Sequence, residues 1–249
     1  MSIGIIAGSG IDFLVPDHEW SEVMTPYGQA YLCSADIAGK EFVLLRRHGP
    51  ALNIPPHLIN YRANIAALQK VGVRQILATA AVGSLQKDIL PGTLAVLDDF
   101  IDFTKQRKAS IYDSPSECVM HVDFTVPYCP EISSAMVRAA SSLDIPMRTG
   151  MTYLCVDGPR YETPAEVRMF SRWGGDVVGM TGVPEVIIAR ELGICYGSLA
   201  IVANYGTGIL DKPLSHMDVL RAIGEQKEKV YRIIEAALVS IDEEHTCVK

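Results

Sequence analysis

Charged and hydrogen-bonding residues follow two of the apolar segments near the start of the chain. Segment 3–7 runs into a Gly-Ser-Gly turn containing Ser9, and segment 42–45 runs into the triplet Arg46-Arg47-His48. Glycines let backbone N–H groups approach an anion, and the Ser9 hydroxyl adds a donor. Guanidinium groups beside an imidazole suit the same ligand. The pattern indicates a phosphate site; a structural turn and a solvated charge cluster are the alternatives.

Three polar residues stand at the ends of later predicted elements. Asn204 ends a buried strand and needs partners for both its amide oxygen and its amide nitrogen, which a planar heterocycle or turn backbone would supply. Thr181 follows a buried strand and either contacts a ligand or satisfies a backbone carbonyl. Glu162 precedes a helix start, where capping is the simpler role. Their combination indicates a purine-type ligand.

Positioning these residues requires parallel strands. In open α/β sheets the ligand crevice lies outside the carboxyl ends of the strands, so groups that follow different strands converge there. The groups expected to meet are Gly8–Gly10, Arg47–Gly49, Ala80–Ala81, Met180–Thr181 and Asn204–Gly206.

Strand-type and helix-type segments alternate along the whole chain, which predicts an α/β fold in one domain over residues 1–249. Apolar runs predict strands at 3–7, 75–79, 94–103, 151–156, 176–180 and 194–203, with a hairpin at 31–46. Helical spacing and start signals predict helices at 59–70 and 131–143, after Thr163, near Pro184, and from Ser215 to about Ser240.

Composition narrows the class of protein. The 249 residues carry a formal charge of −7, which disfavours nucleic-acid binding because phosphate backbones require a basic field. The cysteines show no Cys-x-x-Cys pair and no zinc spacing, so we predict reduced thiols and no metal site; they are Cys33, Cys118, Cys129, Cys155, Cys195 and Cys247. No basic leader and no apolar run of about 20 residues occurs, which predicts a soluble cytoplasmic protein without membrane contact.

Several motifs occur in one order along the chain. They are the Gly-Ser-Gly turn, Arg-His-Gly at 47–49, NYRAN at 60–64, GSL at 83–85, DGPRYET at 157–163 and GMTGVPEV at 179–186. From residue 3 to about 240 the sequence resembles the trimeric purine nucleoside phosphorylase family, which includes the methylthioadenosine phosphorylases. The resemblance implies a mixed, mostly parallel central sheet flanked by helices. It also implies a homotrimer or a dimer of trimers, and metal-free, cofactor-free phosphorolysis of purine nucleosides in purine salvage, with inorganic phosphate as co-substrate.

The resemblance assigns roles to individual positions. Five match phosphate-binding positions: Ser9, Arg47, His48, the backbone of Ala81, and Thr181. Others match nucleoside-binding positions: Tyr161 against the base, Met180 under the ribose, Glu162 and Asn204 on the base edge with Tyr205 and Gly206 beside them, and His216 near the 5′ group. His121 matches a residue lent to the neighbouring subunit's site. Asn204, Glu162 and His48 are the expected catalytic residues.

Glu162 and Asn204, the two residues expected to hydrogen-bond the base, distinguish between branches of the family. A 6-oxopurine has an N1–H group that can donate a hydrogen bond to an ionised Glu162, whereas adenine presents a bare acceptor there and would leave a buried charge unpaired. The Asn204 amide can donate to O6 or accept from a protonated N7. We therefore predict a 6-oxopurine nucleoside as substrate.

Two departures from the family pattern leave open part of the phosphate contact and the 5′ preference, which lies between inosine or guanosine and 5′-methylthioinosine. Leu52 stands where methylthioadenosine phosphorylases carry a histidine, and Ala80 where they carry a phosphate-binding threonine. A methylthioadenosine phosphorylase, a hydrolase of similar fold and a nucleoside-binding protein without activity are the alternatives. A dinucleotide-binding dehydrogenase is disfavoured because the first glycine turn lacks the G-x-G-x-x-G spacing.

Overall fold

A computed structural model describes residues 2–8, 19–112, 121–211 and 215–247, without the side chain of His216. These ranges contain nine strands, five α-helices and a short 3₁₀ helix, η2 (Pro56–Leu58). The strands are β1 (Ile3–Ala7), β2 (Ser21–Thr25), β3 (Gly28–Ile37), β4 (Lys40–Arg46), β5 (Gln75–Ser84), β6 (Leu94–Asp102), β7 (Met147–Cys155), β8 (Val177–Gly179) and β9 (Cys195–Tyr205). The α-helices are α1 (Tyr61–Lys70), α2 (Pro130–Ser142), α3 (Pro164–Arg172), α4 (Gly182–Glu191) and α5 (His216–Ser240).

The strands form one sheet in the order β2-β3-β4-β1-β5-β8-β7-β6-β9. Strand β9 also pairs with β5, so the last five strands of that order close on themselves. Among the described strands, five of the nine pairings are parallel and four are antiparallel. The predicted mixed sheet flanked by helices is confirmed.

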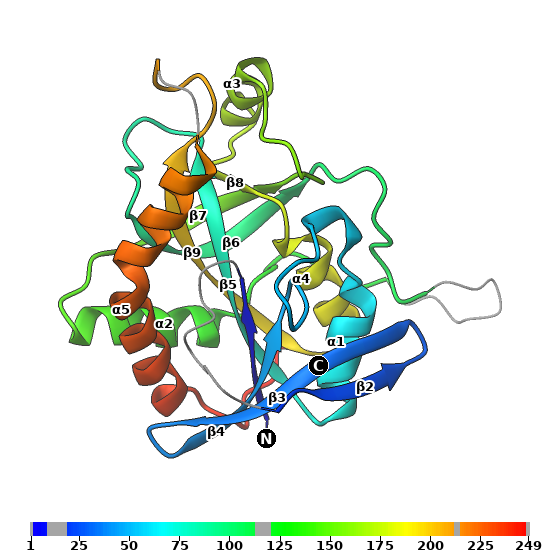
Figure 1. Ribbon diagram of the computed structural model, residues 1–249. Coiled ribbons are helices and arrows are strands. Elements are labelled where there is room, and N and C mark those ends of the chain that lie inside the picture. The colour runs from blue at the N-terminus through cyan, green and yellow to red at the C-terminus, as the bar shows by residue number, and fades with distance from the viewer. Residues whose placement is uncertain (1, 9–18, 113–120, 212–214, 248–249) are drawn as a thin grey trace.

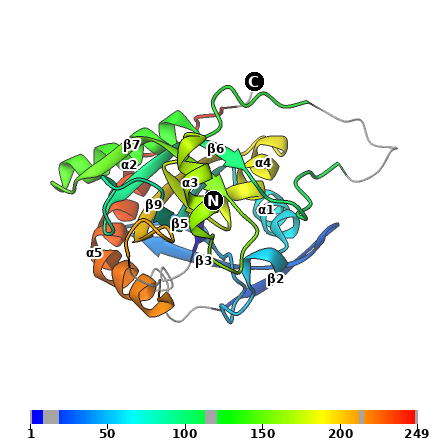
Figure 2. The same ribbon diagram turned by 90° about the horizontal axis from the view of Figure 1, so that it is seen from above.

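Helices cover both faces of the sheet. Helices α2 and α5 lie on one side, and α1 and α4 on the other (Figures 1 and 2). Successive strand residues point to opposite faces. Along β4, Val43 and Leu45 therefore pack in the α1 and α4 cluster, whereas Phe42 and Leu44 pack in the α2 and α5 cluster. No helix in the described part of the chain is long and apolar enough to cross a membrane.

The predicted elements are confirmed in type and order, but several bounds differ and one strand was not predicted. Strand β2 was not predicted, because this edge strand is mostly exposed and lacks an apolar pattern. Strand β7 begins at Met147 rather than 151. Strand β5 continues through its small residues to Ser84, because β9 pairs with it along its whole length.

Two helix starts matter for the site. Helix α3 begins with a capping box, in which the Thr163 hydroxyl accepts from the Glu166 N–H and the Glu166 carboxylate accepts from the Thr163 N–H. Glu162 is therefore not the cap. Helix α5 begins after Ser215 as predicted, but no cap hydrogen bond forms from that side chain.

Candidate active site

A cavity of about 420 Å³ opens where β1, β4, β5, β8 and β9 lead into their loops. The structure brings together in its lining eight predicted site residues from five parts of the chain: Arg47, His48, Ala81, Tyr161, Glu162, Met180, Thr181 and Asn204. Gly8 also lines it, whereas Ser9 lies outside the described residues. The convergence predicted from the strand ends is therefore observed.

A buried ion pair forms one wall of this cavity. The Arg47 guanidinium donates from Nε to Oε1 of Glu185 at 2.9 Å and from Nη2 to Oε2 at 2.6 Å. Arg47 is 1% exposed and Glu185 is fully buried. The Tyr196 hydroxyl also donates to Oε2 of Glu185, at 2.6 Å. Strand β4, helix α4 and strand β9 are thus joined behind the cavity.

The pair sets the charge available to a ligand. Burial acts to lower the pKa of Arg47, but the charge and hydrogen bonds of Glu185 outweigh it and hold the pKa above its ordinary value. A third N–H, on Nη1, donates to the Thr79 carbonyl at 2.7 Å. A guanidinium has five N–H groups, and the described contacts use three of them. One N–H on Nη1 and one on Nη2 are left without a partner among the described residues. Arg47 therefore offers directed donors with a largely balanced charge.

Other donors on the same wall are already partly engaged. The Gly8 N–H donates to the Thr79 hydroxyl at 2.9 Å. The N–H groups of Thr181 and Gly182 donate to the buried Tyr153 hydroxyl at 3.1 and 3.2 Å. The side-chain hydroxyl is therefore the donor that Thr181 can offer to an anion.

His48 is oriented by its own loop. Its Nδ1 lies 2.8 Å from the carbonyl oxygen of Ile54. Because a carbonyl only accepts, this contact places a hydrogen on Nδ1.

Glu162 also lines the cavity. It is 7% exposed, and among the described residues no cation forms an ion pair with it. Burial raises the pKa of its carboxyl above the ordinary value. A buried carboxylate without a cation needs hydrogen-bond donors. A ligand with an N–H edge would supply one.

Asn204 is the penultimate residue of β9 and lies where the register with β5 shifts between Val82 and Gly83. Its Nδ2 donates to the Tyr205 carbonyl at 2.8 Å. A Cβ on Gly83 would lie 3.1 Å from that nitrogen, so the glycine leaves the amide its space. Turn backbone thus satisfies one of the amide N–H groups, and the rest of the amide remains for a ligand.

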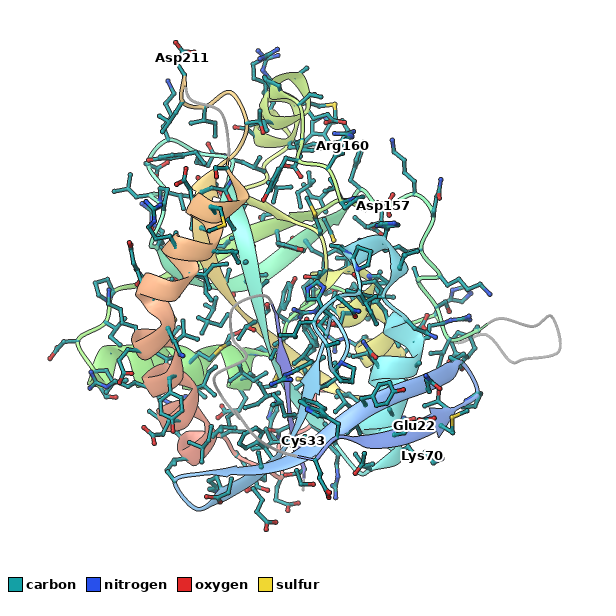
Figure 3. The ribbon with its side chains drawn as sticks, viewed as in Figure 1. Glu22, Cys33, Lys70, Asp157, Arg160 and Asp211 are labelled. Carbon is teal, nitrogen blue, oxygen red and sulfur yellow. The ribbon has the colours of Figure 1, made fainter. Side chains whose placement is uncertain are left out.

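Met180 is held through its backbone by a buried arginine. Its carbonyl accepts from Nη2 of Arg107 at 2.6 Å and from the Tyr61 hydroxyl at 3.3 Å. Arg107 is also paired with Asp157, Nε to Oδ1 at 3.4 Å, in the segment between β7 and α3 (Figure 3). Arg107 therefore fixes the two loops that carry Met180 and Tyr161.

Besides Ser9, four predicted residues lie outside this cavity or its described part. Tyr205 and Gly206 line an adjoining cavity of about 290 Å³, which shares Asn204 with the first. Nothing is described of the His216 side chain, although its backbone begins α5. His121 is exposed and lines neither cavity of its own chain, so its role toward a neighbouring subunit stays a prediction.

Sequence reasoning missed the residues that support the site. Glu185, Thr79, Tyr153 and Arg107 hold other groups in place. Glu185 gave one signal, because it is a carboxylate in the otherwise apolar segment 183–189. Arg107 gave none, since it is one of several basic residues in a loop.

Comparisons with known proteins agree with this geometry. A family profile described as "Phosphorylase superfamily" matches residues 2–239. A protein of Dictyoglomus turgidum named "Probable 6-oxopurine nucleoside phosphorylase" is 45% identical, over 100% of this chain and 95% of the relative. The "6-oxopurine nucleoside phosphorylase" of Pyrococcus furiosus is 46% identical, over 98% and 95%. An "S-methyl-5'-thioadenosine phosphorylase" of the same organism is 42% identical, over 98% and 95%.

Solved structures share the fold. The methylthioadenosine phosphorylase of Schistosoma mansoni in complex with adenine superposes with a TM-score of 0.90 at 32% identity, covering 96% of this chain and 91% of that one. The chain belongs to the phosphorylase superfamily. Within it, the chain falls among the nucleoside phosphorylases, which are pentosyltransferases, so the predicted family and enzyme class are confirmed.

Replacing Glu185 with glutamine should destabilise the fold, because it leaves the Arg47 cation buried without its counter-charge. We expect the free energy of unfolding to fall by about 3 kcal/mol. Tyr196→Phe removes only one hydrogen bond to the same carboxylate and should cost about 1 kcal/mol. Urea unfolding of both variants measures the difference, and equal losses would contradict this view of the pair.

Proposed function

We propose that this chain is a purine nucleoside phosphorylase that cleaves 6-oxopurine nucleosides with inorganic phosphate. The observation that carries the proposal is the shared cavity. Arg47 and Thr181 offer donors for an anion beside His48, while Glu162 and Asn204 line the same cavity as hydrogen-bonding groups for a base. The relatives named 6-oxopurine nucleoside phosphorylase support the same substrate class.

The choice of base follows from Glu162. Its carboxylate is buried, and among the described residues no cation is paired with it. The N1 proton of hypoxanthine or guanine fits that acceptor, whereas the bare N1 of adenine would face it without a hydrogen. Asn204 then donates to O6 or accepts from a protonated N7.

The reaction needs no covalent enzyme intermediate. A phosphate oxygen attacks C1′ of the ribosyl group while the bond from C1′ to N9 breaks, and the bonding electrons leave with the base. The ribosyl group gains positive charge, which the adjacent phosphate stabilises, so catalysis is positioning and electrostatics. The departing base carries negative charge or takes a proton at N7, and Asn204 hydrogen-bonds that edge. Phosphate is a co-substrate, and no cofactor takes part.

A second candidate substrate is 5′-methylthioinosine. Helix α5 contributes Val219, Leu220 and Ile223 to the cavity lining. Such an apolar surface suits a methylthio group better than a hydroxyl. His216, at the start of the same helix, is the residue proposed to meet a 5′-hydroxyl.

Assembly and cellular context belong to the proposal as well. The family resemblance suggests a homotrimer or a dimer of trimers in which His121 reaches the neighbouring site. It also suggests a role in purine salvage in the cytoplasm.

A substrate panel tests the function directly. Inosine, guanosine, adenosine, 5′-methylthioinosine and 5′-methylthioadenosine are each incubated with and without phosphate, and free base and sugar phosphate are measured. We expect 6-oxopurine substrates to be cleaved only with phosphate, and kcat/KM for the 6-amino substrates to be about 10⁴-fold lower. Release of free ribose without phosphate would indicate a hydrolase, and the absence of any product would indicate a binding protein.

The pH dependence tests the base-reading role of Glu162. Its raised pKa means that the carboxyl gains a proton as the pH falls through a value above 4.5, and the protonated form no longer accepts from N1. We expect kcat/KM for inosine to fall on that acid limb.

Glu162→Gln should remove the limb and lower kcat/KM about 10- to 100-fold, since a charge-assisted hydrogen bond becomes neutral. Glu228→Gln, on the exposed side of α5, is the matched control and should keep the wild-type profile. An acid limb that persists unchanged in Glu162→Gln would rule out this assignment.

A further inference from the structure

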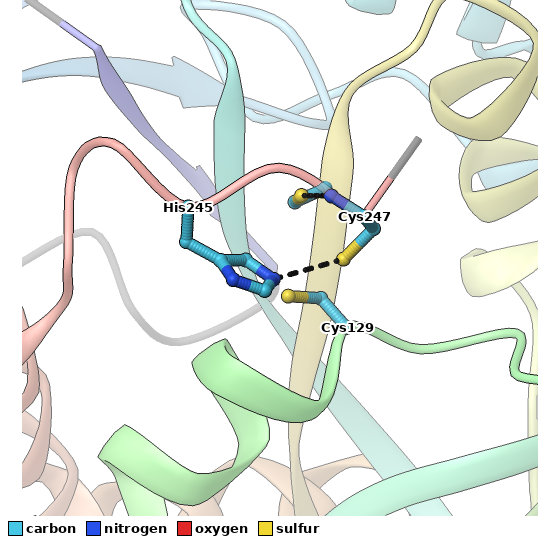
Figure 4. Close-up of side chains that lie close together, drawn as sticks. Cys129, His245 and Cys247 are labelled. Carbon is cyan, nitrogen blue, oxygen red and sulfur yellow. Dashed lines mark hydrogen bonds between the residues drawn. The ribbon is translucent and has the colours of Figure 1, made fainter. Parts of the chain in front are cut away.

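Three cysteines and a histidine meet at the end of the molecule away from the active-site cavity. Cys129 precedes α2, Cys195 begins β9, and His245 and Cys247 lie in the tail after α5. One ligand atom from each lies within 4.8 Å of all the others. Figure 4 shows Cys129, His245 and Cys247 pointing toward one another. Their spacing in the sequence gave no sign of this cluster.

The distances are close to those of a tetrahedral metal site. With zinc bonds of about 2.3 Å to sulfur and about 2.0 Å to nitrogen, the edges of the tetrahedron are about 3.8 Å between sulfurs and about 3.6 Å between sulfur and nitrogen. Sγ of Cys247 lies 3.4 Å from Nε2 of His245. The bound ion would therefore require only small side-chain adjustments.

Backbone hydrogen bonds hold the cluster from several sides. The N–H of Cys129 donates to the Tyr196 carbonyl at 2.8 Å, which ties the start of α2 to β9. The N–H of Cys247 donates to Sγ of Cys195 at 3.0 Å, the kind of contact that stabilises a thiolate ligand.

The tail that carries two of the ligands is docked by a buried side chain. Gln75, at the start of β5, is fully buried, and its Nε2 donates to the Asp242 carbonyl at 2.7 Å and to the His245 carbonyl at 3.0 Å. His245 is thereby placed over the sheet before any ligand binds.

The start of α2 lies beside one of the proposed ligands. Cys129 immediately precedes the 13-residue helix α2, whose N-terminus favours negative charge.

We propose that Cys129, Cys195, His245 and Cys247 bind one Zn²⁺ ion that fastens the C-terminal tail to α2 and β9. Three thiolates with one imidazole form a donor set typical of structural zinc sites, and four protein ligands leave no open position for catalysis. Cys195 and Asn204 lie at opposite ends of β9, about 30 Å apart by strand rise, so the ion takes no part in phosphorolysis. Binding releases the three thiol protons to solvent and needs no oxidant or reductant.

The test measures metal in the whole chain. Protein produced in zinc-supplemented medium is purified with a reductant and without chelators, and zinc per chain is determined by mass spectrometry of the elements. We expect about one zinc per wild-type chain. The Cys247→Ser variant should hold at least about tenfold less zinc per chain than the wild type. Cys33→Ala removes a buried cysteine outside the cluster and should retain the metal.

Cobalt substitution of the wild-type chain gives a second readout that does not depend on variants folding. Co²⁺ in this site should show the visible absorption of a tetrahedral thiolate complex, and added Zn²⁺ should abolish it. Removal of the ion should lower the thermal unfolding midpoint while the reduced protein keeps its phosphate-dependent activity.

Three results would overturn the zinc site. One is the absence of zinc and cobalt uptake by the reduced wild-type chain. Another is equal zinc in wild type and Cys247→Ser. The third is a disulfide among the three cysteines in protein purified without reductant, with no metal bound after its reduction. None of these outcomes bears on nucleoside cleavage, so they are separable from failure of the proposed function.

Discussion

The candidate active site depends on the buried pair between Arg47 and Glu185. A guanidinium in the interior is tolerated only when a charge and hydrogen bonds satisfy it, and Glu185 supplies both. Arg47 also lines the cavity, and two of its N–H groups have no partner among the described residues. Because the pair is nearly neutral, an anion in the proposed site would be bound by aligned donors rather than by excess positive charge. This arrangement is compatible with a chain whose net charge is −7.

The closed part of the sheet brings the two halves of the site together. Strand β9 pairs with β5 along its length, and this places Asn204 beside Gly83 at the end that also carries Arg47. The segment before α3 adds Glu162, and the capping box at Thr163 together with Arg107 holds that segment. Each of these elements therefore contributes one or two side chains, and the fold brings these side chains to the same cavity.

Much of this arrangement could be predicted from local patterns. Apolar runs, Thr163 and Pro130 marked the strands and helix starts, and polar residues after strands marked the cavity. Long-range pairing could not be predicted, because Glu185 and Arg47 are 138 positions apart and neither signals its partner. The extension of β5 through small residues, the support from Arg107 and the meeting of Cys129 with Cys247 likewise arise only when distant segments pack. The GPRYET and MTGVPEV motifs indicated the protein family, which the spacing of the polar residues along the chain does not.

The most direct test is a crystal structure of the chain with hypoxanthine and phosphate bound together. The account predicts phosphate against the remaining N–H groups of Arg47 and the Thr181 hydroxyl, with N1 of the base at Glu162 and its O6 or N7 edge at Asn204. A base bound away from Glu162, or phosphate held in a different cavity from the base, would contradict it.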